Sequence, residues 1–200
     1  VEAPTLRIYL GPNTSPFKGK EGEFNTSRQI SERLKKELET NVGLQVEDNG
    51  IGFTVAGRGE LHLGVLIETM RREGYELAVS RPEVIVKIID GQKMEPIESL
   101  VVDLEEQYQG GVMQRLGERR AQLTNMEPDG KGRVRIDFMI PARGLIGFQT
   151  EFRTITAGTG LLFHVFDHFG PRSEGAIAER QNGVMISNGT GPSPAYAQMM

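Results

Sequence analysis

Apolar and polar residues alternate along residues 6–10, which predicts a β-strand with one buried face. Apolar residues then recur at every fourth position from Ile30, which predicts a helix over 28–39 whose first turn Thr26 or Ser27 can cap. The same reasoning gives the remaining elements of the first half. They are strands at 44–47 and 52–56 around an Asn-Gly turn, a helix at 60–72, a strand at 75–79, and an apolar run at 84–89 that extends past Pro82.

The second half of the chain repeats this order. Val112 and Leu116 lie one turn apart and place a helix within residues 105–123. Strict alternation over 133–140 predicts a half-buried strand. The full series for this half is a strand at 98–103, the helix within 105–123, a strand near Met126, a strand at 133–140, a helix at 143–155 and a strand at 161–166.

Two successive β-α-β-β-α-β series predict an α+β fold built from two tandem ferredoxin-like (split βαβ) sandwiches. We expect one domain over residues 1–90 and a second over 91–173. From residue 174 to 200 the sequence is rich in small and polar residues, and we expect a truncated tail that is too short to form a domain.

Composition agrees with packed domains and excludes several kinds of chemistry. Hydrophobic residues make up 38% of the chain and charged residues 25%. The absence of cysteine excludes disulfides, a thiolate nucleophile and cysteine-ligated metals. No apolar stretch approaches the roughly 18 residues that a membrane span needs, so we expect no membrane contact. The net charge of -4 means that any contact with nucleic acid must use local basic patches.

The sequence gives no support for catalysis or for a cofactor bound by these residues. A phosphate-binding loop needs Gly-Lys followed by Ser or Thr at the start of a helix, but Lys20 is followed by Glu21, and Lys131 leads into a strand. His164 and His168 are predicted to lie on one strand, where four residues span about 13 Å, which is too far to share one metal ion. His62 is interpreted as a packing residue in an apolar helix.

A cluster of basic residues is the strongest candidate for a binding site. The cluster combines a helix with the hairpin that follows it, and its members are Arg115, Arg119, Arg120, Lys131 and Arg133. Arginine suits phosphate because its planar group donates two parallel hydrogen bonds. The alternative is a solvated helix face on which Glu118 pairs with a neighbouring cation, and the sequence leaves both interpretations open.

Several long motifs resemble the BipA/TypA family of bacterial translational GTPases, which is related to elongation factor G. The motifs in the first half lie at 13–17, 26–30, 57–73 and 76–82 and resemble the family's third domain. Those at 128–135 and 143–148 resemble its fifth domain, and 181–183 with 186–189 resemble the start of its C-terminal domain. The chain departs from the family pattern at 191–194, where the family continues with a basic and apolar strand.

The resemblance implies a ribosome-binding region of a translational GTPase involved in stress-responsive translation or ribosome assembly. By the same resemblance, GTP and Mg²⁺ belong to a G domain that this sequence lacks, and the protein is a cytoplasmic monomer whose partners are ribosomal RNA and ribosomal proteins. The five basic residues above are then the predicted contacts with ribosomal RNA.

Two other functions stay open on the sequence. A stand-alone RNA-binding module would need aromatic side chains on the central strands for base stacking, and Phe53 and Phe138 are the candidates. A pair of ligand-sensing regulatory domains would instead bind a small molecule between a strand and a helix.

Overall fold

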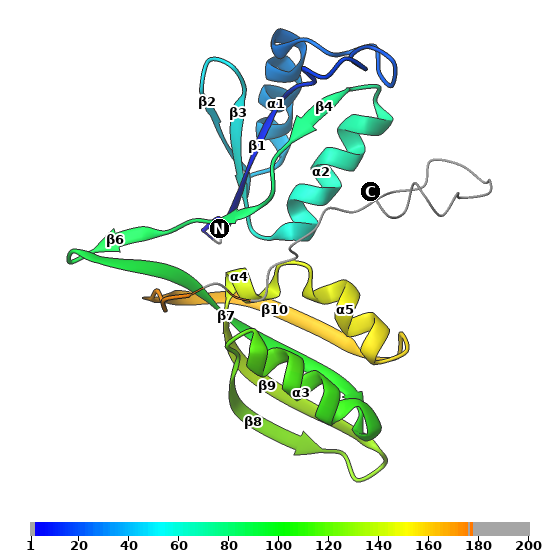
Figure 1. Ribbon diagram of the computed structural model, residues 1–200, viewed down its shortest axis with the longest axis vertical. Helices are drawn as coiled ribbons and strands as arrows, with labels where there is room; N and C mark the ends of the chain where they lie inside the picture. The colour runs from blue at the N-terminus through cyan, green and yellow to red at the C-terminus, as the bar shows by residue number, and fades with distance from the viewer. Residues whose placement is uncertain (1–2, 176, 178–200) are drawn as a thin grey trace, which may run out of the picture.

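The first unit is a five-stranded antiparallel sheet with both helices on one face (Figure 1). The computed structural model describes residues 3–175 and 177. The elements of the first unit are β1 (Leu6–Pro12), α1 (Ser27–Thr40), β2 (Gln45–Asp48), β3 (Phe53–Gly57), α2 (Glu60–Arg72), β4 (Leu77–Val79) and the short β5 (Glu83–Val84). The strand order is β2-β3-β1-β4, with β5 pairing to β1. This is the order of a split βαβ fold.

The second unit has the same topology. It consists of β6 (Lys87–Ile89), β7 (Gln92–Glu105), a 3-10 turn η1 (Glu106–Tyr108), α3 (Gln109–Glu118), β8 (Gln122–Pro128), β9 (Arg133–Pro141), α4 (Ala142–Leu145), α5 (Phe148–Ile155) and β10 (Leu161–Pro171). Its strand order is β10-β7-β9-β8, with β6 pairing to β7. The predicted fold class, two tandem ferredoxin-like sandwiches, is confirmed.

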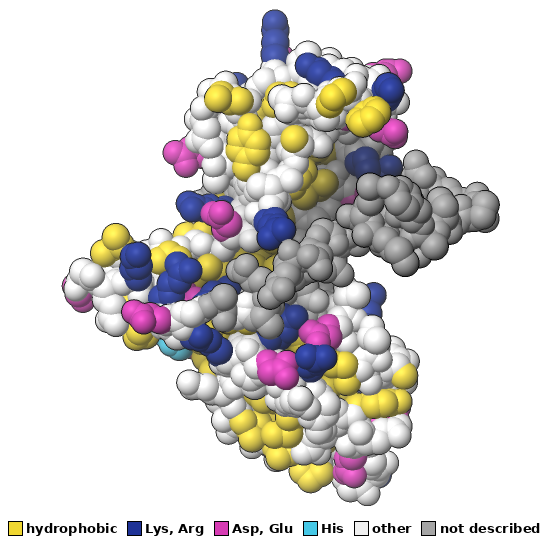
Figure 2. All heavy atoms as spheres, in the orientation of Figure 1, with side chains coloured by type: hydrophobic (Ala, Val, Ile, Leu, Met, Phe, Trp, Pro, Cys, Tyr) yellow, Lys and Arg dark blue, Asp and Glu magenta, His cyan; other side chains and the backbone are white. Residues whose placement is uncertain are grey.

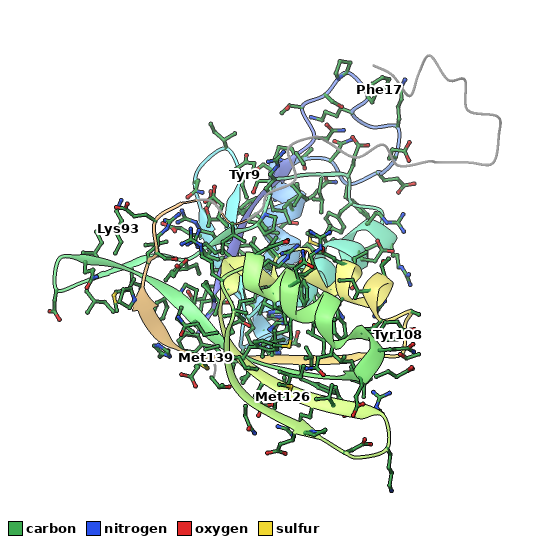
Figure 3. All side chains as sticks on the ribbon, turned by 60° about the horizontal axis from the view of Figure 1, so that its bottom comes forward. Tyr9, Phe17, Lys93, Tyr108, Met126 and Met139 are labelled. Carbon is green, nitrogen blue, oxygen red and sulfur yellow. The ribbon has the colours of Figure 1, made fainter. Side chains whose placement is uncertain are left out.

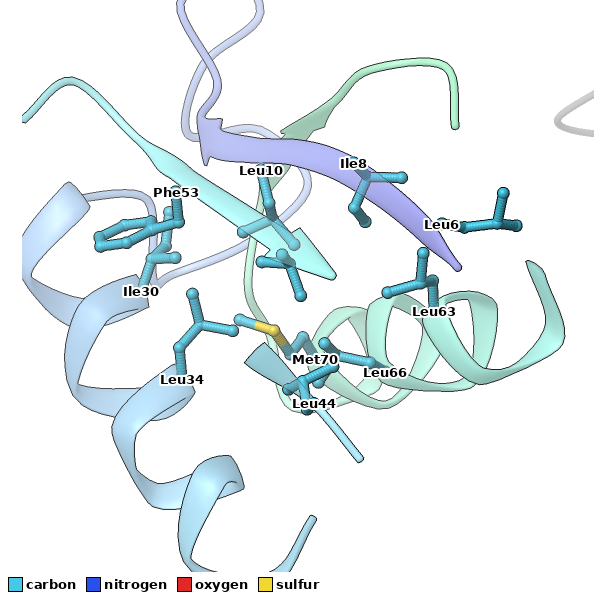
Figure 4. Packing of buried hydrophobic residues seen from close by; sticks show 11 residues of the cluster. Leu6, Ile8, Leu10, Ile30, Leu34, Leu44, Phe53, Leu63, Leu66 and Met70 are labelled. Carbon is cyan, nitrogen blue, oxygen red and sulfur yellow. The ribbon is translucent and has the colours of Figure 1, made fainter. Parts of the chain in front are cut away.

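Each unit buries its own apolar core between helices and sheet. In the first unit, Leu10 of β1, Ile30 and Leu34 of α1 and Met70 of α2 are almost fully buried (Figure 4). In the second unit the corresponding core joins alternate residues of β7 and β9 to Val112, Leu116, Phe148 and Phe152 of the helices. The twofold spacing of β7 and β9 therefore predicted their buried faces correctly, and the fourfold spacing of α1 did so for Ile30 and Leu34 but not for Leu38, which is 39% exposed.

Helix α1 begins where its sequence indicates. The Thr26 hydroxyl accepts the backbone N–H of Gln29, and the Gln29 side chain accepts the backbone N–H of Thr26. This reciprocal pair satisfies two amides that a free helix end would leave open. Of the two candidate caps, Thr26 is therefore the one used.

The predicted helix at 143–155 is wrong in one respect, because it is two helices. Ile146 leaves the helical conformation and Gly147 adopts a left-handed one with φ 72°, so α4 ends before α5 begins. The interruption lets Ile146 pack against the core of the first unit and lets the Gly147 amide donate to Glu60 Oε2 at 3.0 Å. These contacts depend on the other unit, and helical spacing cannot reveal them.

Strand lengths in the second unit also differ from the sequence predictions. β7 and β10 extend well beyond 98–103 and 161–166, and the run at 84–89 is divided between β5 and β6, which pair to different sheets. β8 begins at Gln122, so the predicted helix within 105–123 ends at Glu118. Every residue of β8 is exposed, so its sequence lacks the alternation of apolar and polar residues that predicts a half-buried strand.

Within the described ranges, no helix has the length and apolar character that crossing a membrane requires.

Candidate nucleic-acid interface

The five predicted contact residues lie in the second unit but do not form one uniform patch. Arg115 is on α3, Arg119 caps the C-terminal end of that helix, and Arg120 follows it in a left-handed conformation with φ 65°. Lys131 and Arg133 lie at the turn that joins β8 to β9. The expectation that three arginines share one helix is therefore wrong, because α3 ends before Arg119.

Arg119 is bound inside the unit. Its Nη1 donates to the carbonyl oxygens of Gly144 at 2.8 Å and Ile146 at 3.1 Å, and its Nη2 donates to Glu151 at 2.9 Å. The guanidinium also lies 5.2 Å from the centre of the Phe148 ring, and the side chain is 13% exposed. These contacts join the end of α3 to α4 and α5. Arg119 therefore stabilises the packing of these helices, which its position in the sequence did not indicate.

Arg115 and Arg133 are both charge-compensated. Arg115 pairs with Glu118 at 3.0 Å and with Glu151 at 3.1 Å. The hydrogen bond from Arg115 holds the pKa of the Glu118 carboxyl below its usual value. Arg133 pairs with Asp103 across the β7–β9 register. The Glu118 pairing that the solvated-face interpretation anticipated is therefore present.

Lys131 is the most available of the five side chains. The turn that carries it is fixed by Asp129, whose carboxylate accepts the backbone N–H groups of Lys131 at 2.7 Å and Arg133 at 2.9 Å. These bonds hold the pKa of Asp129 below its usual value. Lys131 is exposed, and within the part of the chain that the structure describes its ammonium makes no ion pair. Phosphate binding by any of the five remains a prediction.

Arginine also fixes the chain where it leaves β10. The buried carboxylate of Glu95 accepts Arg143 Nε at 2.6 Å, and Arg143 Nη2 reaches the Ser173 carbonyl at 2.8 Å. Arg120 Nη2 donates to the Glu174 carbonyl. Arg120 thus has a partner far along the sequence, which charge clustering could not have indicated.

Sequence reasoning missed a second group of cations on the hairpin formed by β6 and the start of β7. The group consists of Lys87, Lys93 and Arg172. Strand pairing brings Lys93 and Arg172, which are distant in sequence, onto one face, whereas Lys87 lies opposite Met94 on the other face. Figure 2 shows Lys and Arg side chains gathered over this hairpin and its base. The usable signal was the Asp90-Gly91 turn, which marks a hairpin at the domain junction.

The long loop between β1 and α1 is organised around the buried carboxylate of Glu76. The Asn13 side-chain amide donates to it at 2.6 Å, and the backbone amides of Gly19 and Glu21 donate at 3.0 and 3.1 Å. The bond from Asn13 and these amides hold the pKa of Glu76 below its usual value. The loop tip presents Phe17, which is 64% exposed (Figure 3).

The histidines have local partners. His62 Nε2 lies 3.0 Å from Asn41 Oδ1, so this half-buried side chain makes a local hydrogen bond. His164 Nδ1 lies 2.5 Å from the buried Glu98, and this hydrogen bond raises the pKa of His164. His164 and His168 both lie on β10 as predicted. Across residues 3–175 and 177, no group of three metal-ligating side chains comes close enough to hold an ion.

The structure removes the basis of one alternative and leaves the other untested. Phe53 is 2% exposed and Phe138 is 3% exposed, so neither can stack on a base as a stand-alone RNA-binding module requires. A groove of about 520 Å³ beside α1 contains Arg33, but Arg33 already pairs with Glu37 at 2.8 Å and with Glu73. The groove is also lined by Lys36 and Glu39, so the ligand-sensing alternative stays a prediction.

Comparison with known proteins gives consistent matches. Residues 92–180 match the family described as elongation factor G C-terminus. The chain is 60% identical over 199 residues to the large ribosomal subunit assembly factors BipA of Salmonella typhimurium and Escherichia coli K12. It is 57% identical to the corresponding factor of Haemophilus influenzae. These alignments cover 98% of the chain but about a third of each relative, 33% of the first two and 32% of the third.

Proposed function

Because the chain belongs to the BipA family, we propose that it forms the ribosome-binding region of a translational GTPase that acts in assembly of the large ribosomal subunit. The observation that carries this proposal is 60% identity along 98% of the chain to factors named for that process. Identity at this level extends over both units, so it includes their surfaces as well as their cores.

The proposal assigns binding and not catalysis to these residues. GTP hydrolysis, with GTP and Mg²⁺, would reside in parts of the whole protein outside this chain, and the protein would act in the cytoplasm as a monomer. The described residues support this division, since their charged groups are mostly engaged in ion pairs and backbone contacts, as at Arg119 and Glu76. Ribosomal RNA and ribosomal proteins are the proposed partners.

Among the five basic residues, the proposal gives Lys131 first place as a phosphate contact. Its ammonium is exposed at a turn whose backbone is already fixed, so binding would order little beyond the side chain itself. Arg115, which is exposed, and Arg120, which is half-buried, come next, since each would have to exchange an existing partner. Arg119 and Arg133 would act by holding the surface in shape.

Co-sedimentation with purified 50S and 30S subunits over a series of salt concentrations tests the proposal. We expect the wild-type chain to pellet with 50S, with an affinity that falls as salt rises. Lys131→Glu should weaken pelleting and lower the log–log salt slope by about one. Lys35→Glu is the matched control, because Lys35 is an exposed lysine of the first unit without an ion pair within the described residues. A wild-type chain that does not pellet with 50S would refute the proposal.

A further inference from the structure

The hairpin of β6 and β7 projects from the second unit as a ribbon (Figure 1), and β10 pairs along the other edge of β7 as far as Met94. Its turn is Asp90-Gly91, with φ 50° and 78°, which matches the right-handed twist of the flanking strands. β6 pairs with β7 along one edge, and Ile88 is 74% exposed. The ribbon thus presents side chains that contribute little to either core.

Strand pairing brings two cations directly opposite each other on this ribbon. Ile88 is paired with Lys93, and the Arg172 backbone amide donates to the Lys93 carbonyl oxygen at 2.9 Å, which continues the β7–β10 register by one residue. Residues directly opposite in antiparallel strands carry side chains on the same face. Ile88, Lys93 and Arg172 therefore form one row across three strands, with Lys93 visible on the ribbon in Figure 3.

This pair of like charges is unfavourable for the fold itself. Like charges directly opposite each other destabilise a sheet. The nearby carboxylates do not relieve the repulsion, since Glu95 pairs with Arg143 at 2.6 Å and Asp167 with His168 at 2.6 Å. Over the described ranges neither Lys93 nor Arg172 makes an ion pair. Two other acids are close in sequence: Asp90 lies at the tip of the turn, and Glu174 follows Arg172 by two residues without an ion pair in the described ranges.

We propose that this hairpin binds the phosphate backbone of double-stranded RNA, with Lys93 and Arg172 contacting neighbouring phosphates. Hydrogen-bonded residues on antiparallel strands are about 5.5 Å apart at Cα, so two long side chains can reach adjacent phosphates. RNA duplexes are recognised mainly through shape and backbone contacts, which a narrow basic ribbon can supply. The inference rests on the proposed function, because it names where on the chain ribosomal RNA is bound.

Lys87 adds a third cation to the same ribbon. Its ammonium lies 4.2 Å from the centre of the Phe169 ring, and it is paired in register with Met94. The aromatic contact orients this lysine without neutralising it. Because Lys87 is paired with Met94, its side chain lies on the opposite face of the ribbon from Lys93 and Arg172. Contact with a duplex on that face therefore rests on Lys93 and Arg172.

The variant Lys93→Glu distinguishes an effect on RNA binding from an effect on folding stability. Opposite Arg172 the new carboxylate replaces repulsion with attraction, so the variant should melt at the same temperature as the wild type or higher. Its affinity for an RNA duplex of about 16 base pairs should nevertheless fall severalfold, with a salt slope lower by about one. Lys93→Arg should bind as the wild type does, and Lys35→Glu should leave both the affinity and the slope unchanged.

The same variants are then pelleted with 50S subunits. Loss of both duplex and 50S affinity in Lys93→Glu, with an unchanged or raised Tm, supports the hairpin as the contact. Wild-type affinity of Lys93→Glu for both probes at every salt concentration overturns the hairpin proposal and leaves the proposed function standing. Duplex binding by the wild type that is lost in Lys93→Glu, with no binding of either protein to 50S, supports the hairpin and overturns the proposed function.

Discussion

At the scale of single residues, the partly buried arginines Arg119 and Arg143 stabilise contacts between segments that are distant in sequence. Arg119 joins α3 to α4 and α5, and Arg143 joins α4 to the segment after β10 through Glu95 and Ser173. A buried or half-buried guanidinium with several fixed acceptors is costly to remove because the acceptors lose their partners. Clustered arginines in a sequence therefore do not by themselves indicate a binding surface.

Arg119→Ala is predicted to destabilise the chain by about 2 kcal/mol, because it removes a charged donor from two carbonyl oxygens and one carboxylate. Chemical unfolding followed by circular dichroism measures this change. Arg153→Ala is the control. Arg153 is exposed on α5 without an ion pair in the described ranges, so its loss should change stability by less than about 0.5 kcal/mol. Equal losses of unfolding free energy in the two variants would show that Arg119 does not stabilise the contact between α3, α4 and α5.

His164 gives a prediction about pH. Its pKa is raised mainly by the hydrogen bond with Glu98, so protonation stabilises the folded state. The added stability is fully present below about pH 6.5, the unfolded value, and is lost as pH rises through the folded pKa. Since the side chain is 35% exposed, solvent screening limits the effect to about 1 kcal/mol or less.

Urea unfolding of the wild type and His164→Gln between pH 5.5 and 8.5 tests this assignment. The stability difference between the two proteins should shrink as pH rises. A difference that is constant with pH, or that grows toward alkaline pH, would show that His164 does not titrate with a raised pKa. An NMR titration of the imidazole gives the same answer directly.

At the scale of secondary-structure elements, the break between α4 and α5 is set by one glycine. No atom lies within 4 Å of the position that a Cβ on Gly147 would occupy, so an added methyl group meets no clash. Gly147→Ala should still destabilise the chain by about 1 kcal/mol, because φ 72° is unfavourable for residues with a Cβ.

Gly117→Ala is the matched comparison for this prediction. Gly117 lies within α3, also without a neighbour near its Cβ position, and its φ is not left-handed. Alanine there should stabilise the chain by about 0.5–1 kcal/mol. Thermal melts of both variants test the pair, and a stabilising Gly147→Ala would mean that the helix break is not held in the left-handed conformation.

The elements that the sequence predicted well are those whose signals are local. Helix α2 occupies 60–72 as predicted, and α1 begins at its capping box. The missed features depend on partners elsewhere: β8 is an exposed edge strand, and the length of β7 reflects pairing with β6 and β10. For the same reason the sequence could propose Lys131 as a contact, which stays a prediction, but could not reveal that Lys93 and Arg172 lie opposite each other, because that placement depends on strand register.

At the scale of the whole molecule, the two units meet through α2, α4 and the segment between α4 and α5. Glu60 at the start of α2 accepts the Gly147 amide, and Ile146 packs into the core of the first unit. The approach is close enough that a Cβ on Gly59 would lie 3.7 Å from the His164 ring. The hairpin leaves this junction and extends away from both cores (Figure 1), so binding there need not disturb either one.

The most direct test of the account is cleavage of ribosomal RNA by a radical-generating iron chelate tethered to the hairpin. The chain has no cysteine, so Ile88→Cys supplies a unique attachment point on the ribbon, and Lys35→Cys supplies a control on the first unit. With 50S subunits saturated by each labelled chain, RNA binding at the hairpin should give localised cleavage of large-subunit RNA from position 88. Cleavage from position 35 should be much weaker. Saturating association without cleavage from position 88 would show that the chain binds the subunit through another surface.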